Sequence, residues 1–166
     1  MSEPSKFKAL LASGRPLISD GAMGTLLHDR GVKLDTCFDA LNIQQPALVA
    51  EIHRDYIEAG AQIIQTNTFG ANRFKLAQHG LAEKVTEINR AGVDLARKEV
   101  EASFKDVLIA GDVGPLGVRL APFGRVQPEQ AFAAFSEQIC ALTSGQVDLL
   151  ILETFADLYE IVEAIR

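Results

Sequence analysis

One pattern recurs four times in this chain: a short apolar stretch ends abruptly in hydrogen-bonding residues. It occurs at residues 17–21, 61–72, 107–112 and 147–154. Each apolar part predicts a buried strand, and helical patterns separate the four. In a parallel α/β fold, this change marks the carboxyl end of a strand, where ligands bind. We therefore expect the four strand ends to form one polar rim.

The segments between these strands predict helices. Residues 46–59 carry an apolar face and end before Gly60, and two longer helices are predicted over residues 82–102 and 128–144. A last helix begins at Asp157, with Glu160 as its capping partner. Four apolar residues predict the buried side of that helix: Leu158, Ile161, Val162 and Ile165. The apolar run at residues 147–152 predicts a strand covered on both faces.

The strand ends fall at residues 20, 66, 112 and 153, as expected for successive β/α units with inserted loops. A small open doubly wound sheet and part of a closed barrel both fit this order. Polar residues at all four ends favour the barrel, which needs roughly 250 residues. The predicted fold class is therefore α/β, with parallel β/α units that form the first four of a (β/α)₈ TIM-type barrel. Residues 1–166 are then one partial domain, its N-terminal half.

Charge and composition exclude several classes of function. A net charge of -6 without clustered Lys and Arg argues against nucleic-acid binding. No apolar run approaches the roughly 18 residues that span a bilayer, so no membrane partner is expected. Cys37 and Cys140 lie far apart, which indicates no disulfide framework and a reducing cytoplasm. The histidines and cysteines lack metal-ligand spacing, so we predict no metal site in these residues.

Residues 111–117 contain three glycines directly after a predicted strand. Such a loop could bind a phosphate. A P-loop is excluded because no Gly-Lys-Ser/Thr follows, and no helical pattern starts directly after the glycines. A phosphate- or nucleotide-binding α/β domain remains one alternative function.

Five motifs in order resemble the homocysteine S-methyltransferase domain. They are DGAMGT at residues 20–25, LNI at 41–43, QTNTFGAN at 65–72, GDVGP at 111–115 and LET at 152–154. That family includes the N-terminal module of cobalamin-dependent methionine synthase and betaine–homocysteine methyltransferase. It also includes bacterial proteins fused to methylenetetrahydrofolate reductase, to which the resemblance is strongest. The similarity runs from about residue 15 to the end of the sequence.

This resemblance implies a (β/α)₈ barrel that transfers a methyl group to the sulfur of homocysteine, giving methionine. A free thiol is mostly protonated at neutral pH, and the family binds it to a Zn²⁺ ion held by three cysteines. Neither Cys37 nor Cys140 matches those cysteines, which we expect on later strands beyond residue 166. We therefore assign no catalytic residue and no metal ligand here, and expect no methyl transfer and no stoichiometric zinc from this chain alone. A folate is one candidate methyl donor.

The resemblance also implies which residues bind the amino-acid part of homocysteine. Glu153 is expected to hold the ammonium, and the backbone around Asp20 and Gly21 the carboxylate. Thr66 and Asn67 are expected to line the site. Three further residues are expected to support it: Thr68, Asp112 and Thr154.

Homocysteine is the expected small-molecule partner, and a fused or separate folate or reductase domain is a further candidate. Unpaired sheet edges invite pairing with another chain. A non-catalytic half-barrel that associates with itself or with a partner is therefore the other alternative function.

Overall fold

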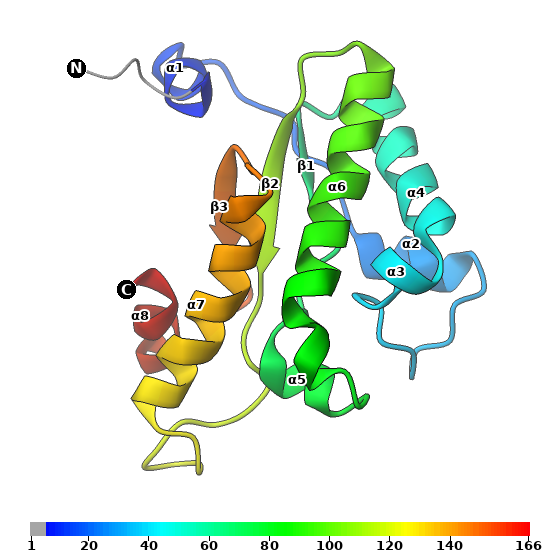
Figure 1. The fold of residues 1–166 in the computed structure, drawn as a ribbon. Coiled ribbons are helices and arrows are strands. Elements are labelled where there is room, and N and C mark those ends of the chain that lie inside the picture. The colour runs from blue at the N-terminus through cyan, green and yellow to red at the C-terminus, as the bar shows by residue number, and fades with distance from the viewer. Residues whose placement is uncertain (1–5) are drawn as a thin grey trace.

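The structure, a computed structural model, describes residues 6–166. Its described strands are β1 (Ile63–Gln65), β2 (Leu108–Val113) and β3 (Leu149–Leu152), which form one parallel sheet in the order β1-β2-β3. Each strand connects to the next through helices that lie on one face of this sheet (Figure 1). The predicted parallel α/β class is therefore confirmed.

The first predicted strand is reduced to a single bridge. Ser19 pairs with Ile63 in parallel, and Asp20 N donates to Ile63 O at 2.9 Å. Ile18 is 62% exposed, so little apolar burial holds the segment to the sheet. Residues 18–20 run beside β1 without becoming a fourth described strand.

Three long helices cover one face of the sheet, as predicted from their apolar periodicity. They are α4 (Pro46–Ala59), α6 (Val85–Ser103) and α7 (Pro128–Ser144), with α6 and α7 lying side by side (Figure 1). Gly60 ends α4 with a φ of 105°, a conformation that favours glycine. The shorter helices are α1 (Lys6–Ala12), α2 (Met23–Asp29), α3 (Leu41–Gln44), α5 (Arg73–Ala77), the 3₁₀ turn η1 (Ala82–Lys84) and α8 (Leu158–Ile165).

The opposite face of the sheet has a smaller core. Ile63, Leu108 and Ala110 are buried there, and Phe7 and Leu10 of α1 pack against them. No helix among the described residues has the length and apolarity required to cross a membrane.

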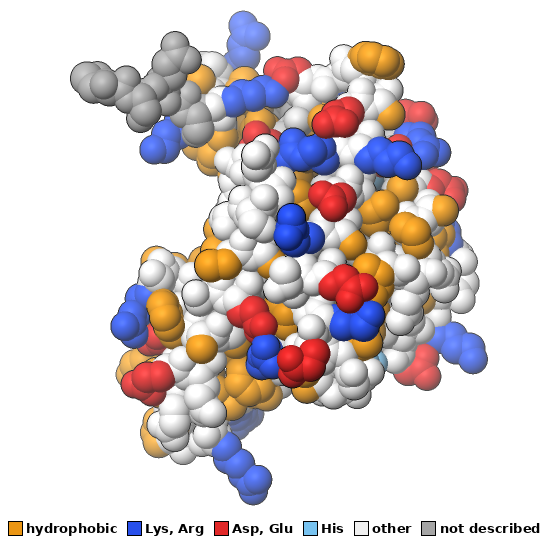
Figure 2. Space-filling view, viewed as in Figure 1, with side chains coloured by type: hydrophobic (Ala, Val, Ile, Leu, Met, Phe, Trp, Pro, Cys, Tyr) orange, Lys and Arg blue, Asp and Glu red, His pale blue; other side chains and the backbone are white. Residues whose placement is uncertain are grey.

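The edge strand and last helix differ from their predictions. All four residues of β3 are partly exposed, so the expectation of a strand covered on both faces was wrong. This follows because β3 has a neighbour on one side only within residues 6–166. Apolar side chains are exposed in the region of α7 and α8 (Figure 2).

The predicted buried side of α8 was also wrong. Leu158 is 81% and Ile165 68% exposed, whereas Glu160 is 5% exposed. Glu160 faces inward because its Oε1 accepts a hydrogen bond from Leu116 N at 2.7 Å. Asp157 does cap the helix, accepting from Tyr159 N at 2.8 Å, but Glu160 takes no part in that cap.

Candidate functional site

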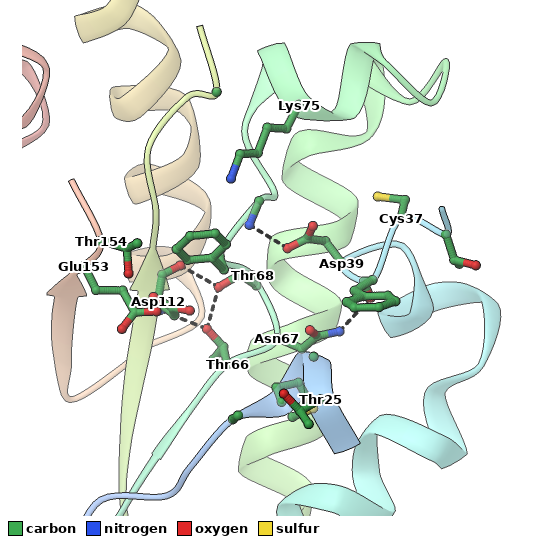
Figure 3. Close-up of a pocket in the computed structure, with 18 of the residues that line it drawn as sticks. Thr25, Cys37, Asp39, Thr66, Asn67, Thr68, Lys75, Asp112, Glu153 and Thr154 are labelled. Carbon is green, nitrogen blue, oxygen red and sulfur yellow. Dashed lines mark hydrogen bonds between the residues drawn. The ribbon is translucent and has the colours of Figure 1, made fainter. Parts of the chain in front are cut away.

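The carboxyl ends of the three strands open onto one cavity of about 620 Å³, a size typical of small-molecule sites (Figure 3). Its walls come from residues 22–25, residues 34–39, the segments after β1 and β3, and the end of β2. Six of the predicted site residues line it together: Thr66, Asn67, Thr68, Asp112, Glu153 and Thr154. Asp20 and Gly21 do not line it.

Two hydroxyl groups join the wall after β1 to β2. Thr68 Oγ1 donates to Asp112 O at 2.8 Å, and Asp112 N donates to Thr66 Oγ1 at 3.1 Å. Since Thr68 has given its only proton to a carbonyl, Thr66 must be the donor in the 2.6 Å bond between the two hydroxyls. Both side chains are buried and committed to this network. Their role in the site is to hold its wall rather than to donate protons to a ligand.

Asn67 presents an acceptor to the cavity. Its Nδ2 donates to Phe38 O at 2.8 Å and to Asn42 Oδ1 at 3.0 Å, which uses both of its N–H groups. Its Oδ1 has no partner among the described residues. A ligand that carries an N–H donor could use this oxygen.

Asp112 and Glu153 form an acidic pair at the cavity. Asp112 is 6% exposed, and its Oδ1 is buried without a partner among residues 6–166. Burial, and next the charge of Glu153, raises the pKa of Asp112 to about 8. Asp112 is therefore largely protonated at neutral pH. The Glu153 side chain makes no hydrogen bond or ion pair to the described chain, so its carboxylate is available to a cation.

Thr154 follows Glu153 with a φ of 62°, in the left-handed region that β-branched residues rarely occupy. Thr154 lines the cavity, and strained backbone conformations of this kind cluster at functional sites.

Asp20 and Gly21 hold the chain beside the cavity. Asp20 Oδ2 accepts from Gln65 N at 2.8 Å, and its Oδ1 accepts from Ser19 Oγ at 3.1 Å. Burial raises the pKa of Asp20. A Cβ added at Gly21 would lie 2.9 Å from Tyr56 Oη, so a side chain has no room there. Asp20 therefore secures the segment that continues into the lining residues 22–25, and Gly21 lets this segment pass close to Tyr56.

Sequence reasoning missed two charged residues of the cavity. Asp39 Oδ1 accepts from Gly70 N at 2.8 Å, and burial raises the pKa of Asp39 to about 6. Lys75 Nζ lies 4.2 Å from the centre of the Phe69 ring, and burial lowers its pKa. Asp39 falls in a segment without periodicity, and Lys75 in a short helix whose pattern does not show its orientation. The available signal was their proximity in sequence to the motifs at residues 41–43 and 65–72.

Glycines of the 111–117 loop have packing roles. Gly111 lies inside β2, where an added Cβ would meet Leu150 at 2.9 Å. Gly114 lies against Phe69, whose ring would be 2.3 Å from an added Cβ. These contacts explain the two glycines without a phosphate.

The described residues do not fit a metal centre. No group of three or more His, Cys, Asp and Glu side chains in residues 6–166 could hold an ion. Cys37 lines the cavity as a half-buried free thiol, and Cys140 is exposed on α7.

Known proteins with similar sequences include methionine synthases and a homocysteine S-methyltransferase. The chain is 32% identical over 160 residues to the methionine synthase of Mycobacterium leprae (strain TN), covering 91% of this chain and 13% of that protein. It is 35% identical over 176 residues to the homocysteine S-methyltransferase of Escherichia coli (strain K12), covering 97% of this chain and 57% of that protein.

Solved structures of the homocysteine methyltransferase MmuM from E. coli share the fold. Its oxidized form has a TM-score of 0.83 at 32% identity, and its metallated form 0.80 at 31%. The alignments cover 95% and 93% of this chain and 59% of the MmuM chain. The chain thus spans less than two thirds of the length of these relatives.

A family model described as homocysteine S-methyltransferase matches residues 17–166. The match includes every segment of the cavity wall. The chain therefore belongs to the homocysteine S-methyltransferase family.

Proposed function

We propose that this chain binds the amino-acid part of homocysteine in the cavity, for methyl transfer to its sulfur that gives methionine. The observation that carries the proposal is the unpaired Glu153 carboxylate beside the buried, unpartnered Asp112, in a chain of this family. An α-ammonium group supplies the charge and the N–H donors that this arrangement lacks.

In this proposal the ammonium contacts Glu153 and Asn67 Oδ1. The carboxylate takes backbone N–H groups of the lining residues 22–25, a segment that follows Asp20 and Gly21 and that Asp20 secures through its bond to Gln65 N. Thr66, Thr68 and Asp112 support the wall, and Thr154 sets the direction of the Glu153 segment. The homocysteine sulfur then points into the remaining volume, toward the methyl donor.

The proposal extends to a complete (β/α)₈ barrel of which residues 1–166 form the first four units and one partial domain. It is supported by the strand-like segment 18–20 beside β1 and by relatives of greater length. Zinc, which as a Lewis acid stabilises the thiolate, would need ligands from outside residues 6–166. A folate donor and a fused donor or reductase domain fit the much longer methionine synthase relatives. The two free cysteines support a cytoplasmic location.

Calorimetric titration with L-homocysteine tests the proposal. We expect saturable binding, and at least about 100-fold weaker binding of 4-mercaptobutanoic acid, which keeps the thiol and carboxylate but lacks the ammonium. L-Methionine, the product, should compete with homocysteine for the cavity. Equal affinities for the two ligands, or no binding of homocysteine at all, would contradict the proposal.

The exposed apolar face favours a second candidate function, association with a second copy of this chain. Leu158, Val162 and Ile165 on α8 are each more than half exposed, and β3 has an unpaired edge among the described strands. Light scattering should then show a dimer that Val162→Lys converts to a monomer. A wild-type monomer at high concentration would exclude this candidate.

A further inference from the structure

Asn42 is a buried residue of α3 that lines no part of the cavity. It is 2% exposed, and its Nδ2 donates to Asn67 O at 2.8 Å and to Ile88 O at 3.1 Å. Both partners are carbonyl oxygens, which only accept. The side-chain amide of Asn42 therefore has one possible orientation, with Oδ1 turned toward the side chain of Asn67.

This orientation fixes that of Asn67. Asn42 Oδ1 needs a donor, and it receives Asn67 Nδ2 at 3.0 Å. Phe38 O is a second acceptor beside it: it takes Asn67 Nδ2 at 2.8 Å in addition to Leu41 N at 3.1 Å. A flipped Asn67 would place its own oxygen against two acceptors. Asn67 Oδ1 is consequently the atom left toward the cavity.

We propose that Asn42 is a positioning residue that makes the cavity selective for a ligand ammonium by locking the Asn67 amide with its oxygen inward. The identity of the ligand as an amino acid rests on the proposed function. The locked amide itself rests on the hydrogen bonds alone. Without Asn42, only Phe38 O still holds the Asn67 amide, so the flipped orientation, which offers an N–H group and repels an ammonium, becomes accessible.

Asn89 of α6 provides a matched control. It is fully buried, and its Nδ2 also donates to two carbonyls, Ala71 O at 2.7 Å and Val85 O at 2.8 Å. Its Oδ1, in contrast, has no partner in the described chain. Replacing either asparagine removes two hydrogen bonds, one to a carbonyl of α6 and one to a carbonyl of the segment after β1, but only Asn42 orients a side chain of the cavity.

The experiment compares the affinities of L-homocysteine and 4-mercaptobutanoic acid for wild type, Asn42→Ala and Asn89→Ala. We expect Asn42→Ala to lower the preference for the ammonium-bearing ligand about tenfold, because a hydrogen bond to a charged group is lost. Asn89→Ala should either weaken the binding of both ligands by the same factor or leave both affinities unchanged. Asn67→Ala should show the same reduced preference as Asn42→Ala, and the double variant no further reduction. A preference that is undiminished in Asn42→Ala would overturn the inference.

A ligand-free measurement separates this inference from the proposed function. In ¹⁵N-labelled chain, the Asn67 side-chain NH₂ signal, identified by its loss in Asn67→Ala, should exchange slowly with water. It should remain slow in Asn89→Ala and become fast in Asn42→Ala, or in Asn42→Ser if the alanine variant does not fold. Fast exchange in wild type would refute the locked amide even if homocysteine binds. If homocysteine does not bind although the signal is protected, the proposed function is contradicted, and the fixed orientation of the Asn67 amide is supported.

Discussion

Two of the cavity's walls are unlike. The first wall is the segment after β1 (residues 66–72), and the second wall is the segment after β3 (residues 153–157). Buried polar side chains from three helices bond to the first wall: Asn42 of α3 to Asn67 O, Asn89 of α6 to Ala71 O, and Gln138 of α7 to Thr68 O. The second wall has no comparable support within residues 6–166. The Glu153 side chain is unbonded there, and Thr154 adopts a left-handed φ.

This difference indicates how the site divides its tasks. Buried side chains hold the backbone carbonyls of the first wall in place, although Asn89 Oδ1 and Gln138 Oε1 lack partners among the described residues. Such a buried hydrogen-bond network restricts the wall to one arrangement, so the first wall presents fixed acceptors. A strained, half-exposed segment has a low local stability and can adjust to a ligand. The first wall therefore sets the geometry of the site, and the second supplies the charge.

Breaking the hydroxyl network of the first wall should have the largest effect. Thr68→Val removes the bond to Asp112 O and the acceptor of the Thr66 hydroxyl, leaving two buried groups unpaired. We expect the free energy of unfolding to fall by about 2–3 kcal/mol in urea titration. Thr143→Val is the control, because that exposed hydroxyl bonds its own helix, and it should cost less than about 0.5 kcal/mol. Equal losses in the two variants would show that the first wall is no more rigid than a surface turn.

Removing the charge of the second wall should affect binding and leave stability unchanged. Glu153→Gln keeps the shape of the side chain but removes the carboxylate, so homocysteine affinity should fall about 10- to 100-fold by calorimetry. The unfolding midpoint should not move, since Glu153 has no described side-chain partner to lose. Glu129→Gln, at the exposed start of α7, should leave the affinity unchanged and lower the unfolding midpoint only slightly, since it removes a first-turn charge that favours the helix. A Glu153→Gln variant that is destabilised but binds homocysteine normally would show that Glu153 supports the fold rather than supplying charge to the ligand.

The sequence predicted the first wall better than the second. Apolar periodicity identified β1, β2 and α4, and the polar residues after β1 correctly marked the cavity. It could not show that Thr66 and Thr68 bond each other and Asp112, because their partners lie on another strand. The backbone around Asp20 and Gly21 was expected to hold the ligand carboxylate, but neither residue lines the cavity, and the Asp20 side chain bonds Gln65 N.

The failures at β3 and α8 have one physical origin. Periodicity reveals that a helix has an apolar side, but not which neighbouring surface is present to bury it. In α8 the hydrogen bond from Leu116 N turns Glu160 inward, and Leu158 and Ile165 are left exposed. Lys75 and Asp39 escaped prediction because single charged residues carry no periodic signal.

The pH dependence of stability tests the raised pKa of Asp112, which lies at the end of β2 between the two walls. Its pKa is raised from 3.8 to about 8, so the folded chain retains a proton that the unfolded chain has lost between these values. Stability therefore falls as pH rises through this window, by at most about 1.4 kcal/mol per pH unit. The raised pKa of Asp39, about 6, adds to the slope below that pH. Between pH 6.5 and 8, wild type should lose about 1.5 kcal/mol more stability than Asp112→Asn, measured by urea titration at each pH. Parallel slopes in wild type and variant would remove Asp112 as the titrating group.

Relieving the strain of the second wall should have the smallest effect. Thr154→Gly allows the φ of 62° without steric cost, although glycine also loses more chain entropy on folding. The two terms leave a net gain of up to about 1 kcal/mol, visible as a modest rise in melting temperature. Thr25→Gly, at an exposed cavity position in α2 without a positive φ, should instead be neutral or destabilising. If the strain positions Glu153, the stabilised Thr154→Gly variant will bind homocysteine more weakly than wild type. A gain in stability with unchanged affinity would mean that the second wall is strained but takes no part in orienting the charge.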